Sequence, residues 1–99
     1  MIARTVSVDV GTERMSDVLD AYREAVRPIH ERAAGLESHV VLADRDAGRL
    51  LFIGLWDSEE SVADVAAELE PARKRLWDAF GRSPELVRYE VVDRIRIGG

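Results

Sequence analysis

The chain has 99 residues and contains no cysteine, which excludes disulfides, thiolate metal sites and cysteine nucleophiles. Its formal charge of -5 at pH 7 provides no basic surface for phosphates, so we expect neither nucleic acid nor a membrane as a partner. The composition, with 46% hydrophobic and 33% charged residues, is typical of one folded domain over residues 1–99. Because the sequence has neither cysteine nor an apolar leader, we expect a cytoplasmic protein.

Residues 2–10 alternate between apolar and polar side chains, and this period of two predicts a first strand. Val6 and Val8 belong to the apolar face, whereas Ser7 lies at the centre of the polar face. If the apolar face meets the helices, the polar face meets either a partner sheet or solvent.

Apolar residues then recur at helical spacing from Met15 to Ala33, which predicts a helix of about five turns. Pro28 lies inside this pattern and has no backbone N–H to donate. We therefore expect a kink or a break near Arg27.

Residues 39–43 and 50–56 are predicted to form a hairpin, because residues 44–48 between them are rich in turn formers. The second of these strands is apolar on both faces, so both faces should be covered. We expect helices on one face and a partner sheet on the other, and we assign Leu50 and Phe52 to the face that the partner covers.

A second helical region follows, which either Asp57 or Ser58 can cap. The apolar stripe of this helix runs to Leu69. Pro71 suits the first position of a further short helix, so the pattern predicts a break between the two. Residues 86–97 are predicted to form the last strand.

The predicted order is βαββαβ. Right-handed crossovers then place both helices on one face of an antiparallel sheet, which is a ferredoxin-like α+β arrangement. The other face would be bare, and the simplest cover for it is a second copy of the chain related by a two-fold axis. The expected assembly is a homodimeric α+β barrel.

Several segments of the sequence resemble the antibiotic biosynthesis monooxygenase domain of the dimeric α+β barrel superfamily. They are Gly35-Leu36-Glu37-Ser38, the run Leu55-Trp56-Asp57-Ser58-Glu59-Glu60, and Val87-Arg88-Tyr89-Glu90-Val91-Val92. The resemblance implies a homodimer with a cavity between each sheet and its helices. Members of this family include cofactor-independent monooxygenases of aromatic polyketide pathways and haem-degrading monooxygenases.

The haem-degrading branch matches this chain poorly. It has an Asn on the first strand, where this chain has Val6, Ser7 and Val8. It has a Trp and an iron-binding His further on, where this chain has Val65 and Arg75. We therefore expect no haem and no other cofactor. Two histidines without nearby cysteine or repeated acidic spacing do not predict a metal site either.

Two residues are candidates for catalysis. His30 lies at the edge of the long helix's apolar stripe and could act as a base, and Trp56 ends a strand and could stack on a ligand or donate to it. The ordinary alternatives are a partly exposed histidine and a strand-end anchor. The candidates for substrate contact, each of which could instead be a structural residue, are Tyr22, Ser7, His39, Phe52, Trp77 and Phe80.

Two main hypotheses about function remain open, beside a third and weaker one, which is haem binding. The first is a cofactor-independent monooxygenase that acts on a small aromatic or polyketide-like substrate. The second is a non-catalytic dimeric domain that binds a ligand or assists another protein. An apolar cavity on which His, Arg or Tyr converges would favour the enzyme, whereas a cavity filled by Phe52, Trp56 and Trp77 would favour the second hypothesis.

Overall fold

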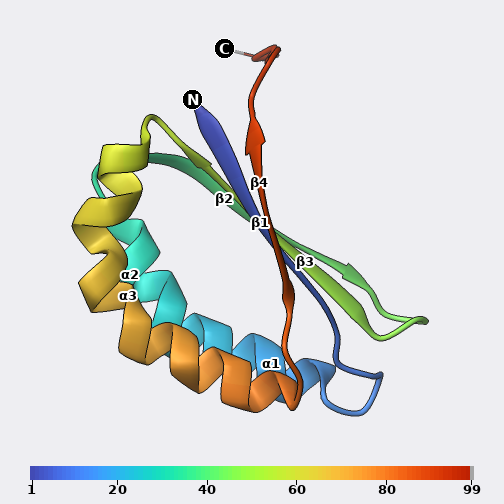
Figure 1. Cartoon of the computed structure of the whole chain (residues 1–99). Coiled ribbons are helices and arrows are strands. Elements are labelled where there is room, and N and C mark those ends of the chain that lie inside the picture. Colours follow the sequence, from blue (N-terminus) through green and yellow to red (C-terminus); the bar gives the residue numbers. More distant parts are fainter. Residues whose placement is uncertain (99) are drawn as a thin grey trace.

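The computed structural model describes residues 1–98 as a four-stranded sheet with helices packed on one side of it (Figure 1). The elements in chain order are β1 (Ile2–Asp9), α1 (Met15–Ala21), the π-helical turn η1 (Tyr22–Val26), α2 (Arg27–Glu31), β2 (Leu36–Asp44), β3 (Arg49–Trp56), α3 (Glu59–Phe80) and β4 (Glu85–Glu90). All neighbouring strands are antiparallel, in the order β2-β3-β1-β4. The predicted ferredoxin-like α+β fold is confirmed.

The strand β3 shows which side of the sheet the helices cover. Leu50, Phe52 and Trp56 are at most 4% exposed and belong to the core beneath the helices. Removing an apolar side chain of this size from water stabilises the fold by roughly 1.5–3 kcal/mol. The expectation that a partner covers this face was wrong, because the helices already bury it.

The open face, which we define as the side of the sheet away from the helices, carries the alternate residues of the same strands. Ile53 and Leu55 are only half-buried there, and Val40 and Leu42 on β2 are 40% and 49% exposed. Ser7 of β1 pairs with Leu51 and shares this face. An apolar centre with few charges is unusual for a solvent-facing sheet surface.

The long first helical region is interrupted where the sequence predicts a disturbance. The turn η1 precedes Pro28, and the backbone N–H of Arg27 bonds to the carbonyl of Tyr22 five residues earlier. This wider turn brings the chain past the proline without ending the helix, since Pro28 lacks the N–H that a regular helix requires.

The helix α3 is continuous through Pro71, so the predicted break between two helices was wrong. Leu69 and Leu76, which flank the proline at a spacing of two turns, are both 3% exposed on the same buried face. Pro71 itself is exposed, as is Ala67, whose carbonyl loses its helical donor. Water can bond to that carbonyl, so the buried stripe on either side keeps the helix whole. Ser58 caps it, accepting a hydrogen bond of 3.2 Å from the backbone N–H of Ser61.

The last strand is shorter than the predicted range 86–97. In the described sheet it lies at the edge, beside β1, and the backbone N–H of Val91 donates a hydrogen bond of 3.1 Å to the carbonyl of Met1. The apolar alternation continues past Val91, but the described residues beyond it form no strand.

Among the residues that the structure describes, no helix is both long and apolar enough to cross a membrane.

We expect Pro71→Ala to stabilise the protein, because alanine restores the missing backbone donor in a helix interior. The gain should be up to about 3 kcal/mol in the free energy of unfolding, measured by urea denaturation. Pro84→Ala is the control, since it removes a proline from the loop before β4 and should lower stability by about 0.4–1 kcal/mol. A loss of stability in Pro71→Ala would show that α3 needs the proline to follow the sheet.

Candidate functional site

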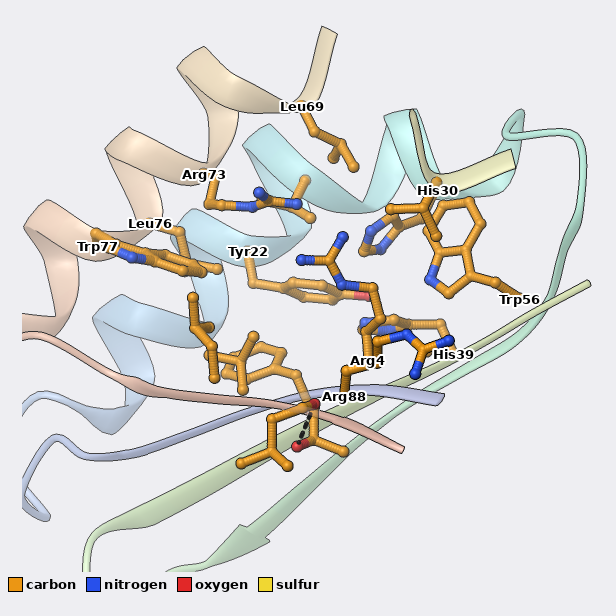
Figure 2. A pocket seen from close by; sticks show the side chains of 18 residues that line it. Arg4, Tyr22, His30, His39, Trp56, Leu69, Arg73, Leu76, Trp77 and Arg88 are labelled. Atoms are coloured by element: carbon orange, nitrogen blue, oxygen red, sulfur yellow. Dashed lines mark hydrogen bonds between the residues drawn. The ribbon is translucent and has the colours of Figure 1, made fainter. Parts of the chain in front are cut away.

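A cavity of about 230 Å³, partly open to solvent, lies between the helix-covered face of the sheet and α3 (Figure 2). We call it the inner cavity. Its walls are mostly apolar and aromatic, contributed by Val26, Phe52, Trp56, Leu69, Leu76 and Trp77. A volume of this size suits a small organic molecule better than a row of waters, because the apolar walls offer few hydrogen bonds.

Gly54 keeps part of this space open. A β-carbon at this position would lie 3.0 Å from the indole Nε1 of Trp56 and 3.5 Å from Cδ2 of His39. Any larger residue in the middle of β3 would therefore push these two side chains aside or fill the cavity.

Three polar side chains meet at one end of the inner cavity. The Tyr22 hydroxyl lies 3.0 Å from Nδ1 of His39, and their rings stack with centroids 5.5 Å apart. The His30 ring is closer still to His39, at 4.4 Å between centroids. Nδ1 of His30 is buried and has no hydrogen-bond partner among residues 1–98. We call these three residues the His–Tyr cluster.

The two histidines of the cluster are uncharged near neutral pH. Burial lowers the pKa of each from 6.5 to about 4. For His30, the neighbouring His39 and the positive charge of Arg73 lower the pKa further in the same direction. Burial also raises the pKa of Tyr22, so its hydroxyl keeps its proton. The cluster can therefore accept a proton from a bound molecule.

The π-helical turn decides how two of these residues are presented. Tyr22 is the first residue of η1, and His30 follows on α2. A π turn holds more residues than a regular turn, so it rotates everything after it about the helix axis. His39 reaches the same place from β2, where it pairs with Gly54.

The His–Tyr cluster also forms the floor of a second, open depression, which we call the outer groove. The groove measures about 490 Å³ and its remaining lining is largely polar and charged, including Arg23, Arg27, Glu31 and Ser38. The cluster thus stands between an apolar interior and a wet, charged exterior.

Sequence reasoning missed three arginines that line the inner cavity: Arg4 of β1, Arg73 of α3 and Arg88 of β4. Arg88 is exposed and pairs with Glu59. Arg4 and Arg73 are partly buried, and burial together with the charge of Arg4 lowers the pKa of Arg73. A signal was present, because Arg4 shares the strand face of Val6 and Arg73 lies between Leu69 and Leu76 on the buried stripe.

Six of the predicted site residues line the inner cavity: Tyr22, His30, His39, Phe52, Trp56 and Trp77. Ser7 does not, because it lies on the open face of the sheet. Phe80 packs behind the lining, with its ring centroid 5.2 Å from that of Trp77. Within residues 1–98, no group of three or more His, Cys, Asp or Glu side chains could hold a metal ion.

The sequence profile of one protein family, described as antibiotic biosynthesis monooxygenase, matches residues 1–68 of this chain. The matched range includes the His–Tyr cluster and Trp56. Arg73 and Trp77, which α3 contributes to the inner cavity, lie beyond it.

Solved structures with the same fold include a dimeric ferredoxin-like protein from an uncultured marine organism and a monooxygenase of Streptomyces coelicolor in complex with the ligand nanaomycin D. The first is 17% identical, covers 98% of this chain and 92% of its own, and has a TM-score of 0.78. The second is 17% identical, with the same coverage and a TM-score of 0.73. At these identities the similarity establishes the fold alone.

A curated relative, an uncharacterized protein of Mycobacterium tuberculosis, is 24% identical over 89 residues, which are 90% of this chain and 40% of the relative. The chain therefore spans 40% of the length of the curated relatives it matches.

The lowered histidine pKa values predict how stability depends on pH. Between the ordinary value of 6.5 and the folded value of about 4, the unfolded chain binds protons that the folded chain does not. The free energy of unfolding should therefore be highest above pH 6.5 and fall as the pH decreases toward 4.

Urea denaturation across this pH range measures the effect. His39→Gln should lose less stability over the window than the wild type, because one of the two groups is gone. Glu13→Gln, which removes an exposed carboxylate that forms no ion pair within residues 1–98, should keep the wild-type slope. A His39→Gln curve parallel to the wild type would mean that the histidine is not buried in its neutral form.

Proposed function

Because the chain belongs to the antibiotic biosynthesis monooxygenase family, we propose that it is a cofactor-independent monooxygenase that oxidises a small, polyketide-like phenol. The observation that carries this proposal is the His–Tyr cluster, in which two uncharged histidines meet at the wall of an apolar cavity. A monooxygenase of Streptomyces coelicolor with the same fold was solved in complex with the ligand nanaomycin D, which supports a small-molecule ligand for this chain as well.

The first step is removal of the phenolic proton. His30 and His39 are fully in the proton-accepting form at neutral pH, since their pKa values are about 4. Such bases are weak, so the phenol itself must become more acidic in the cavity. The positive charges of Arg4 and Arg73, which share the same lining, stabilise the phenolate and lower its pKa.

The second step needs no group beyond the substrate and oxygen. The phenolate gives electrons to O₂, and a new C–O bond forms at the ring carbon para to the hydroxyl. One oxygen atom becomes the second quinone oxygen, and the other leaves as water with the hydrogen of that carbon and the hydroxyl proton. Phenol and O₂ thus yield quinone and water, with all atoms and electrons accounted for.

The remaining contribution of the protein is orientation and the exclusion of water. Phe52, Trp56 and Trp77 offer ring faces and edges against which a planar substrate can pack. An apolar enclosure also prevents water from quenching the ring anion before oxygen reacts with it.

We expect the purified protein to consume oxygen with a hydroxynaphthalene substrate and without added cofactor. His30→Gln and His39→Gln should each lower the rate by about a hundredfold, because a positioned base contributes that order of acceleration. Trp56→Phe should mainly raise KM by removing a stacking surface. Ser7→Ala on the open face is the matched control and should keep the wild-type rate. Tight binding of the phenol with no oxygen uptake would instead support the non-catalytic ligand-binding domain.

We also propose that the open face of the sheet meets the same face of a second copy. The support is the half-buried and exposed apolar surface around Ile53, Val40 and Leu42. A related structure is a dimeric ferredoxin-like protein, which is consistent with pairing through the sheet. A two-fold axis lets this surface cover itself.

Leu42→Glu should shift the protein from dimer to monomer, because it places a charge in the middle of the proposed interface. Size exclusion with light scattering gives the solution mass at micromolar concentration. Asp64→Lys, a charge change on exposed α3, should stay dimeric. If wild-type protein is already a monomer, the open face is not an interface between copies.

A further inference from the structure

The inner cavity holds two positive charges that the protein itself does not neutralise. Arg4 and Arg73 form no ion pair and no side-chain hydrogen bond with any residue that the structure describes. Glu70, one turn earlier on α3, affects the charge of Arg73 without pairing with it. None of the residues that line the cavity is an Asp or a Glu.

Most of the other arginines have a carboxylate partner. Within residues 1–98, seven of them sit within ion-pair distance of a carboxylate, and all but Arg94 have side chains more than half exposed: Arg23, Arg27, Arg32, Arg49, Arg75, Arg88 and Arg94. Water would solvate these charges without any partner. Four further arginines, Arg14, Arg45, Arg82 and Arg96, also form no ion pair with any described residue, but they are exposed and water solvates them. Arg4 and Arg73 are partly buried and lack a carboxylate partner as well, although removing a charge from water carries a large penalty.

Resting on the monooxygenase function proposed above, we propose that Arg4 and Arg73 form an anion subsite that binds the carboxylate of an aromatic hydroxy acid. Figure 2 shows the two side chains reaching into the cavity from the sheet and from α3. Two guanidinium groups brought together from separate elements suit one carboxylate, which accepts several charge-assisted hydrogen bonds.

The neighbouring groups fix how such an acid would lie. The guanidinium of Arg73 is 6.0 Å from the ring centroid of Trp77, so the charged end of the subsite borders an aromatic wall. The His–Tyr cluster occupies the same cavity on the helical and β2 side. An acid held at Arg4 and Arg73 can therefore pack its ring against the aromatic walls of the cavity that the His–Tyr cluster also lines.

The subsite would also act on the base. The charge of Arg73 helps to keep the pKa of His30 low in the empty protein. A bound carboxylate offsets one of the two positive charges, so His30 becomes a stronger base once the substrate is in place, and the net positive charge that remains still favours the phenolate. A neutral ligand of the same shape has no such effect.

The test compares two probes that differ only in charge: a hydroxynaphthoic acid, with hydrogen on the ring carbon para to its hydroxyl, and the primary amide of the same acid. Binding is measured by calorimetry and by quenching of the fluorescence of Trp56 and Trp77. We expect the wild type to bind the acid at least about tenfold more tightly than the amide, a difference of about 1.4 kcal/mol.

Variants test whether the two arginines cause this preference for the acid over the amide. Arg4→Met and Arg73→Met should each bring the affinities for acid and amide close together, whereas Arg73→Lys should keep part of the preference. Arg82→Met is the control, because Arg82 is an exposed arginine away from the cavity lining, and it should behave as the wild type. Acid and amide of equal affinity in the wild type, or no binding of the acid, would overturn the proposal.

A second readout separates binding from a structural role. If the arginines serve a ligand, Arg73→Met should keep or raise the melting temperature of the ligand-free protein, because it removes a partly buried charge that faces a like charge. A fall of several degrees would mean that Arg73 supports the fold and would count against the subsite.

The same experiments distinguish a failure of the subsite proposal from a failure of the proposed monooxygenase reaction. Selective binding of the acid without oxygen uptake keeps the anion subsite and removes the proposed reaction. Oxygen uptake at equal rates with acid and amide, together with equal affinities, keeps the reaction and removes the subsite.

Discussion

The sheet is covered by helices on one face only, and the rest of the molecule is arranged around that asymmetry. On the covered side the core is closely packed at one end, where Leu50 and Phe80 are at most 1% exposed. At the other end Gly54 supplies no side chain, and the inner cavity takes its place. Cavity walls lose packing partners, so this space lowers stability and the well-packed end has to offset it.

Much of the fold could be predicted from the sequence, because period-two and period-3.6 patterns report directly on buried faces. The wrong predictions concern features that depend on what packs against an element, which the sequence pattern of that element does not report. Pro71 is typical of a helix start, yet α3 continues through it. Leu69 and Leu76 lie on the same buried face on either side of the proline, and their packing keeps the helix continuous. A strand apolar on both sides, as β3 is, does not tell which side the helices take. Alternation beyond Val91 predicts a strand, but a strand also requires a hydrogen-bonded neighbour, and the described sheet pairs none with these residues.

Several residues that line the candidate site could be chosen from the sequence, but their arrangement could not. Tyr22, His30, His39 and Trp56 could be selected by their chemistry, whereas the contact between the two histidines depends on η1 and on the pairing of β2 with β3. Arg4 was missed for a different reason. Arginine is usually solvent-exposed, so its place in line with buried valines was not read as a sign of a cavity.

The geometry of the His–Tyr cluster depends on a residue count as much as on residue identities. The turn η1 holds one residue more than a regular turn, and a single deletion within 22–26 would let a regular helix form in its place. Everything after the deletion would turn by about 100° around the helix axis, carrying His30 away from His39 while every reactive side chain remained present. Inheritance of the same histidines by a relative is therefore no guarantee of the same site. The length of this one turn has to be inherited with them.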